Sequence, residues 1–363
     1  MFLMKRYTLL IALALTAAFA CNGRPASPDF DKAAVDKGLD SLPKNDNPTQ
    51  QKDEIDGGDV EQGEVSDPTD DDKGEPEPLK PEPVKPDPIK PDPVKPDPVK
   101  PEPELCQNLS AEKAFKGYVT ITSGGKARKF FLTIPSNYNP KVPMPVVFGF
   151  HGRDYDGIRM RDYLDLEKFG EWALFVYPDA LSRNWQGDTF IGWQNGPLGG
   201  KFGGGEDLIF VDDMIAYMKK RFCTDTKNYF ATGQSWGGDF SNVVGCYKGS
   251  SFRAILPVAA NGAYYLPKDA KSGDCTGNPA AWPMHSKTDE YFPVKLGEEY
   301  RDFWLKRNSC SQETTKLPIN DDCFEYKGCA QSTRWCLYTG NHQVPRSYYS
   351  SEAVKFFRGF VGK

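Results

Sequence analysis

Histidine is scarce in this chain of 363 residues, which has only three, and none of its nine cysteines forms a C-x-x-C pair. Zinc sites are commonly built from such pairs together with histidines, so we expect no metal and no cofactor. Lysine and arginine form no basic stripe, and the net charge is −5. Because phosphate neutralisation needs clustered cations, these absences exclude nucleic acid as the expected partner and favour a neutral or solid one.

The apolar run near the N-terminus is too short to span a bilayer. Lys5 and Arg6 precede apolar residues 9–19, and residues 18–20 (AFA) provide a small-residue cleavage site, so we interpret residues 1–20 as an export signal. Cys21 follows at once, which predicts a bacterial lipoprotein that touches the membrane only through a lipid on Cys21. An ordinary secretory signal with an incidental cysteine is the alternative, and both place the protein outside the cytoplasm.

Residues 21–104 contain almost no aromatic side chains. Their first part, up to about residue 73, is polar and acidic without a periodic apolar face, which predicts disorder. Residues 75–104 carry a five-residue repeat, such as VKPDP at 84–88, and proline at this density excludes helices and sheet ladders. We therefore expect a Pro-rich stalk that rises ~3.1 Å per residue. A ligand for proline-reading domains is the alternative.

The roughly 260 residues of the segment 105–363 are enough to bury a substantial core. Residues 118–122 and 130–134 flank a Gly-Gly turn and predict a hairpin. Apolar runs predict buried strands at 145–150, 173–177, 229–232 and 254–258, and helical spacing marks 208–218 and 353–360. Strands that alternate with helices after an initial hairpin predict one α/β domain with a mostly parallel, doubly covered sheet.

The sequence GQSWGG at residues 233–238 lies between a predicted strand and a predicted helix. A G-x-S-x-G motif in this setting is typical of a nucleophile on a strained turn, where larger flanking side chains would collide with the strand and the helix. We therefore expect Ser235 to be a nucleophile. The oxyanion that forms on the substrate during its attack would face the N-terminus of the following helix. A purely structural turn is the alternative.

A serine nucleophile needs a general base, and His342 lies in a loop between the strand at 335–338 and the last helix. We expect His342 to be this base and Asp289, in a loop after an earlier strand, to orient it. The neighbouring Glu290 is the alternative acid, and His285 is expected to be a packed polar residue. A non-catalytic surface loop remains the alternative for His342.

The oxyanion amides are expected from Trp236 and from Gly152 or Arg153. His151 ends a buried strand just before Gly152, so its expected role is to shape this loop.

Several segments resemble secreted feruloyl esterases and the related polyhydroxybutyrate depolymerase-type esterases. They are CTDT at 223–226, YFATGQSWGG at 229–238 and PVAA at 257–260, and the Asp289 segment, RNSC at 307–310 and the His342 loop follow in similar order. The resemblance covers about residues 116–363. It implies an α/β-hydrolase fold and metal-free hydrolysis of esters on plant cell-wall polysaccharide, or of short hydroxyacid polyesters. RDY at 153–155 departs from it, being bulkier and more charged than the loop usual there.

Residues 181–205 read as a long Gly-rich loop, and long loops in compact domains are often functional. Its Trp185 and Trp193 are expected either to stack on a sugar or ferulate ring of the substrate or to form a hydrophobic plug under the loop.

With Cys21 set aside for lipid, an even number of cysteines in an oxidising compartment predicts disulfides. The expected topology pairs Cys223 with Cys246 and, across a hairpin, Cys323 with Cys336. Elimination then pairs the remaining four as Cys310–Cys329 and Cys106–Cys275.

The sequence as a whole predicts a monomeric, exported serine esterase that works by double displacement. An inactive hydrolase scaffold that binds polysaccharide is an alternative from another class. A peptidase is less favoured because no propeller or large lid domain is visible in the sequence.

Overall fold

The computed structural model describes Cys106, Leu109 and residues 114–185, 187–196, 204–319 and 321–362. The predicted export signal, Cys21 and the predicted stalk lie outside these residues. Among the described residues, no helix combines the length and the apolar character needed to cross a bilayer.

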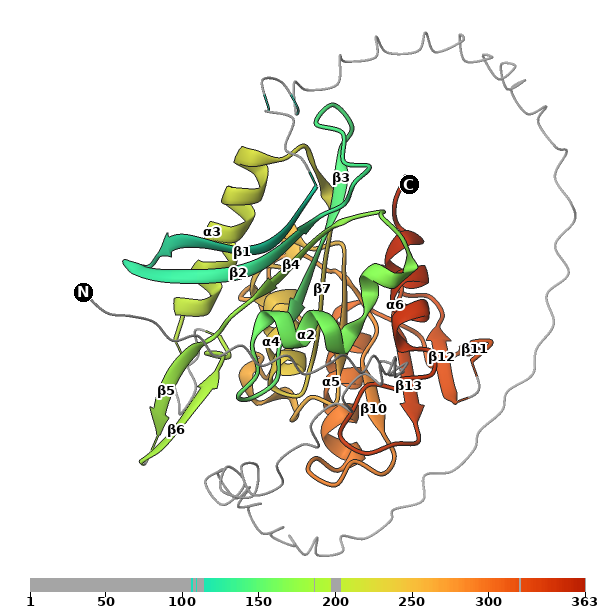
Figure 1. Ribbon diagram of the computed structural model, residues 1–363. Helices are drawn as coiled ribbons and strands as arrows, with labels where there is room; N and C mark the ends of the chain where they lie inside the picture. Colours follow the sequence, from blue (N-terminus) through green and yellow to red (C-terminus); the bar gives the residue numbers. More distant parts are fainter. Residues whose placement is uncertain are drawn as a thin grey trace, which may run out of the picture. The chain divides into compact units, whose positions relative to one another are not determined.

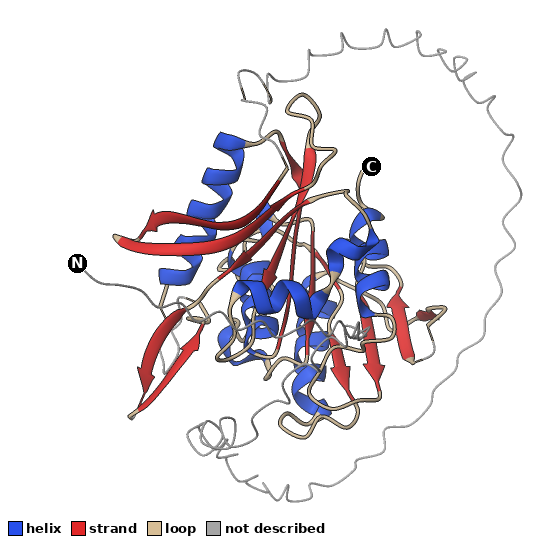
Figure 2. Cartoon of the chain, in the orientation of Figure 1, coloured by secondary structure: helices blue, strands red, loops and turns tan. Residues whose placement is uncertain are grey.

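Within the described ranges, eleven strands form one sheet in the order β1-β2-β4-β3-β7-β8-β10-β13-β12-β11, with β9 beside β8. Its centre consists of six strands that are parallel to one another: β4 (Leu174–Pro178), β3 (Met144–Phe150), β7 (Thr224–Gln234), β8 (Ala254–Val258), β10 (Met284–Ser286) and β13 (Arg334–Tyr338). Antiparallel strands flank this centre: β1 (Phe115–Ser123) and β2 (Lys126–Ile134) on one side, and β12 (Asp322–Tyr326) and β11 (Thr314–Lys316) on the other. The short strand β9 is Ala280–Ala281. The mostly parallel sheet is confirmed (Figure 2).

Helices cover both faces of the sheet (Figure 1). One core contains apolar residues of α3 (Glu206–Arg221), α4 (Trp236–Tyr247) and α5 (Val294–Arg307). The second core contains apolar residues of α2 (Gly157–Leu164) and α6 (Tyr349–Arg358). Short 3-10 helices occur at Leu166–Phe169, Gly249–Ser251 and Ala263–Tyr265. Successive β3 residues Val147 and Phe148 point into different cores, as strand alternation requires. The predicted double covering is confirmed.

The segment predicted to be a long loop contains an antiparallel hairpin of β5 (Leu181–Trp185) and β6 (Asp188–Gly192), which forms a separate small sheet. The expectation of a loop throughout residues 181–205 was therefore wrong. The strands escaped prediction because both are short and neither alternates apolar with polar residues, since 182–184 are all polar and Phe190 and Ile191 are both apolar.

Four disulfides occur in the described part of the chain, and two of the predicted pairs are confirmed, namely Cys310–Cys329 and Cys323–Cys336. The predicted pairs Cys223–Cys246 and Cys106–Cys275 are wrong, because the structure pairs Cys106 with Cys223 and Cys246 with Cys275.

Backbone contacts explain the two corrected pairs. The N–H of Thr276 donates to the carbonyl of Cys246 at 2.7 Å, which brings the neighbouring Cys275 to the end of α4. The carbonyl of Cys223 accepts the N–H of Met144 at 2.9 Å, so Cys223 lies against the start of β3 rather than the end of α4.

Candidate active site

Ser235 lies on the turn between β7 and α4 with a positive φ of 56° and ψ of −126°. A non-glycine residue in such a conformation costs of order 1–3 kcal/mol and persists only where its surroundings hold it. The N–H of Ser235 donates to the carbonyl of Val258 at 2.9 Å. A Cβ on Gly237 would lie 1.9 Å from the carbonyl oxygen of Phe150, and one on Gly233 would lie 2.3 Å from that of Gly237. Close backbone packing therefore requires both glycines of the motif.

His342 and Asp289 meet on loops that follow neighbouring parallel strands, β13 and β10. Their side chains are 2 % and 0 % exposed, and His342 Nδ1 lies 2.7 Å from Asp289 Oδ2. Because a carboxylate accepts, Nδ1 donates, which leaves Nε2 of the imidazole able to take up a proton. The side-chain amide of Gln234, next to Ser235, donates to the carbonyl of His342 at 2.9 Å. This contact holds the histidine loop beside the serine turn.

Further hydrogen bonds join the two loops to each other. The hydroxyls of Ser286 and Thr288 both donate to the carbonyl of Gly340, the latter at 2.6 Å. The hydroxyl of Tyr338 donates to the carbonyl of Gln343 at 2.5 Å, across the turn that carries the histidine. Each such bond contributes about 1 kcal/mol, and together they restrict the position of the imidazole.

Asp289 is held as a carboxylate by its surroundings. Its Oδ1 accepts the N–H groups of Tyr291 at 3.0 Å and Phe292 at 2.9 Å. Burial alone would raise the pKa of the Asp289 carboxyl, but the hydrogen bond and electrostatic attraction of His342 and the two backbone amides outweigh it, and the pKa lies below its usual range. The rings of Tyr291 and Phe292 also meet His342 edge-on, with centroids 5.2 and 5.0 Å away. The charged partner and the imidazole are thus both shielded from water.

The other two predictions for this region concern Glu290 and His285. Glu290 is exposed, so it is not placed as Asp289 is. His285 is buried, and its Nε2 lies 2.9 Å from the carbonyl of Phe292 and 3.8 Å from Asp289 Oδ2. Burial lowers the pKa of His285, which favours the neutral ring expected of a packed residue.

The loop after β3 lies directly against the serine turn. A Cβ on Gly152 would be 3.5 Å from the Cβ of Ser235 and 3.4 Å from the carbonyl oxygen of Gln234. His151, fully buried, accepts the N–H of Ala180 through Nε2 at 2.9 Å, so its proton sits on Nδ1 and is donated to the carbonyl of Gly152 at 2.6 Å. Burial lowers the pKa of His151 and thereby favours this neutral form. These two hydrogen bonds of His151 hold the backbone of the loop after β3 in place, as expected from the sequence.

Trp193 has no exposed surface and stacks on Phe240 with ring centroids 4.8 Å apart. Its indole N–H donates to the carbonyl of His151 at 2.8 Å. The expected stacking of Trp193 on a substrate ring is therefore wrong, because the indole is enclosed in the core. The alternative, a hydrophobic plug under the loop, fits its position. The side chain of Trp185 lies outside the described residues.

Asp239, one helical turn after Ser235, is a buried ionisable residue that sequence reasoning missed. Its Oδ1 accepts the N–H of Asn261 at 2.7 Å and the hydroxyl of Tyr300 at 2.9 Å. Burial raises the pKa of Asp239 to about 8, although these two hydrogen bonds act in the opposite direction. A lone carboxyl among the apolar residues that follow the GQSWGG motif was the signal that could have revealed it.

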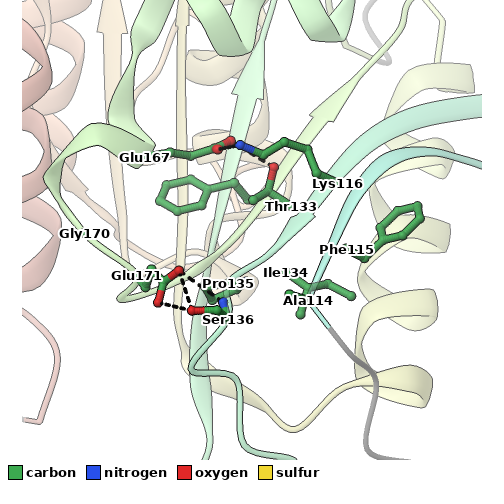
Figure 3. Close-up of a pocket in the computed structure, with 11 residues that line it drawn as sticks. Ala114, Phe115, Lys116, Thr133, Ile134, Pro135, Ser136, Glu167, Gly170 and Glu171 are labelled. Carbon is green, nitrogen blue, oxygen red and sulfur yellow. Dashed lines mark hydrogen bonds and ion pairs between the residues drawn. The ribbon is translucent and has the colours of Figure 1, made fainter.

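A cavity of about 360 Å³ lies at the amino end of β4, where Glu167 and Glu171 form part of its lining (Figure 3). Glu167 pairs with Lys116 at 2.9 Å, and Glu171 accepts the hydroxyl of Ser136. Because Ser235 follows the carboxyl end of a parallel strand, this cavity lies at the opposite end of the sheet. Over the described ranges, no group of His, Cys, Asp and Glu side chains is arranged to hold a metal ion.

The fold, a serine on its strand-to-helix turn and a His–Asp pair on later loops define a serine hydrolase of the α/β-hydrolase type. No protein-family model matches the chain. Feruloyl esterase D of Neurospora crassa is 26 % identical over 246 residues, covering 62 % of this chain and 77 % of the relative. Feruloyl esterase C of Emericella nidulans is 26 % identical over 239 residues, covering 61 % and 80 %.

Among solved structures, an acetyl xylan esterase from Aspergillus awamori superposes with a TM-score of 0.53 at 14 % identity, covering 67 % of this chain and 99 % of that one. This likeness supports the fold. The predicted resemblance to feruloyl esterases is confirmed, and the chain is a serine carboxylic-ester hydrolase. The four disulfides among the described residues are typical of a protein that folds outside the cytoplasm.

Proposed function

We propose that this protein hydrolyses feruloyl or acetyl esters of plant cell-wall polysaccharide, with Ser235 as nucleophile, His342 as general base and Asp289 as its orienting acid. One observation carries the catalytic assignment. The Nδ1 hydrogen bond from His342 to a buried Asp289 leaves Nε2 as acceptor, in a fold that presents Ser235 on a strained turn. The relatives named feruloyl esterases support the substrate class.

In the proposed reaction, Ser235 Oγ attacks the ester carbonyl while His342 Nε2 takes its proton. The backbone N–H of Trp236, in the first turn of α4, and one from Gly152 or Arg153 stabilise the oxyanion. His342 then protonates the departing alcohol, and a water molecule, deprotonated by the same ring, releases the acid. Asp289 stabilises the imidazolium in both steps without itself taking the proton.

The test is a product survey with the purified full-length protein. We expect release of ferulate from methyl ferulate or acetate from acetylated xylan, and loss of at least 10³-fold in kcat in Ser235→Ala. Hydroxybutyrate oligomers serve as the comparison substrate for the polyester alternative. Turnover that survives the Ser235→Ala substitution would refute the nucleophile, whereas exclusive hydrolysis of the oligomers would refute the polysaccharide-ester assignment.

We further propose that the protein is exported through residues 1–20, lipidated on Cys21 and held away from the membrane by residues 21–104. The sequence of the signal, the position of Cys21 and the proline repeat support this proposal. The substitution Cys21→Ser should move the protein from the membrane fraction to the soluble extracytoplasmic fraction. An unchanged distribution would contradict lipid anchoring.

A further inference from the structure

The β5–β6 hairpin makes several separate contacts with the loop that follows β3. Asp154, at a positive φ of 60°, donates its N–H to the carbonyl of Ile191 at 2.9 Å. The Oδ1 atom of the same residue accepts the N–H of Ile191 at 2.8 Å. Asp154 therefore binds both the N–H and the carbonyl of Ile191 in β6, one through its side chain and the other through its backbone.

The side chain of Arg153 and the backbone of His151 are held as well. Arg153 Nη2 lies 2.6 Å from Asp188 Oδ2, and its guanidinium carbon is 4.8 Å from the centre of the Phe190 ring. On the other side of Gly152, the indole of Trp193 donates to the carbonyl of His151. The hairpin and the residue after it thus contact the loop at positions 151, 153 and 154.

The same hairpin packs on the residue that follows the nucleophile. The ring centroids of Phe190 and Trp236 are 5.0 Å apart. The backbone of Gly192 approaches the same indole so closely that a Cβ there would lie 3.2 Å from its ring atoms. One small sheet therefore contacts both segments from which the oxyanion amides are proposed to come.

The base of the hairpin is fixed to the main sheet. Arg183 of β5 donates to the carbonyl of Gly192 at 2.7 Å and to Oδ2 of Asp207 at 2.5 Å. Asp207, at the start of α3, has a fully buried side chain, and its Oδ1 is 2.7 Å from Arg128 of β2. This buried arrangement makes the hairpin a support rather than a free flap.

We propose that the β5–β6 hairpin positions the two halves of the oxyanion hole relative to each other, and that Asp154 is the positioning residue that fixes the Gly152–Arg153 half. The inference rests on the proposed function, since an oxyanion hole has meaning only for ester hydrolysis. Amide donors stabilise an oxyanion only when they are held at hydrogen-bond distance from it. Displacement of about 1 Å can cost as much as 10²-fold in rate.

Three substitutions separate the two properties of Asp154. Asp154→Asn keeps a side-chain acceptor and tolerates positive φ, Asp154→Gly keeps only the conformational freedom, and Asp154→Ala keeps neither. We expect near-normal kcat for the asparagine variant. For the glycine and alanine variants we expect roughly ten- to one-hundred-fold lower kcat, with alanine lower, and KM changed by less than about threefold.

The kcat values are expressed per active site, titrated with a phosphonate ester that labels Ser235, so that misfolded protein does not count. The inhibition constant of a boronic acid that mimics the tetrahedral intermediate should rise in parallel with the loss of kcat. Asp165→Ala is the matched control, because Asp165 also has a positive φ of 48° but lies at the end of α2. Glycine and alanine variants of Asp154 whose kcat per titrated site matches that of the control would overturn the inference.

A second readout does not depend on activity. Hydrogen exchange of the backbone amide at 154, which donates to the carbonyl of Ile191, should be faster in Asp154→Gly than in the parent protein, while the amides of α6 stay unchanged. Unchanged exchange at 154 would overturn the inference even if the protein hydrolysed no ester. If the parent protein lacks esterase activity while Asp154→Gly still shows the faster exchange, the proposed function alone is refuted.

Discussion

Replacing Asp289 by asparagine should inactivate the protein without unfolding it. The carboxylate is fully buried and accepts three hydrogen bonds, two on Oδ1 from the backbone N–H groups of Tyr291 and Phe292 and one on Oδ2 from His342 Nδ1. Asparagine has the same shape but only one accepting oxygen. Its orientation therefore decides the outcome.

The surroundings select one orientation of the new amide. With its oxygen toward the two backbone N–H groups, both bonds survive. In the flipped orientation, two buried donors are left unsatisfied, at a cost of about 1–3 kcal/mol each. The first orientation is thus favoured, and it turns the –NH₂ group toward His342. Nδ1 must then accept, so the ring proton moves to Nε2, and the imidazole can no longer take a proton from Ser235.

The expected loss in kcat is roughly 10³- to 10⁴-fold, about 4–5.5 kcal/mol of barrier, with the melting temperature little changed. Steady-state hydrolysis of p-nitrophenyl acetate and a thermal scan measure the two effects. Glu290→Gln, at the exposed neighbouring carboxylate, is the control and should retain parental kcat. If Asp289→Asn kept more than about a tenth of the parental kcat, Asp289 would not set the tautomer of His342.

Two further predictions concern stability. Since burial raises the pKa of Asp239 to about 8, its contribution is full below the usual carboxyl pKa and is lost as pH rises through about 8. Asp239→Asn should therefore flatten the fall in urea midpoint between about pH 5 and pH 8, and equal slopes would contradict this. A Cβ on Gly237 meets the Phe150 carbonyl at 1.9 Å, whereas one on Gly245 meets the movable end of Ile255 at 2.7 Å. Gly237→Ala should thus lose more than about 3 kcal/mol and Gly245→Ala about 1–3 by denaturant titration, and equal losses would refute the backbone argument.

The fold was largely predictable because the amino-acid composition of its strands reflects whether each strand is buried on one face or on both. The apolar runs that became β3 and β8 are covered on both faces, so every side chain in them had to be apolar. The helix α2 was not predicted, since only Gly157, Met160 and Leu164 of its eight residues are buried. Three positions are too few to establish a helical period.

The placement of Ser235, Asp289 and His342 was predictable for a topological reason. Each follows a strand of a parallel sheet, and the carboxyl ends of such strands meet at one edge. Disulfide pairing was less accessible because it depends on which way a chain end turns. Cys223 and Cys246 flank the same strand–helix unit, yet one lies against β3 and the other against the loop at 275–276. No local pattern encodes that difference.

The contacts between the β5–β6 hairpin and the RDY segment account for the unusual sequences of both. In the sequence, residues 153–155 were an unexplained departure from a small-residue loop, and residues 181–205 were an unstructured stretch with two tryptophans. In the structure, Arg153 and Asp154 bond to Asp188 and Ile191, so the bulk and charge of one segment are matched by a short strand in the other. Neither half predicts the contact alone, because both hydrogen bonds of Asp154 go to a backbone that any residue could provide. A chain that replaced RDY with small residues would therefore need another way to hold the hairpin, or would lose the contacts that we propose fix its oxyanion amides.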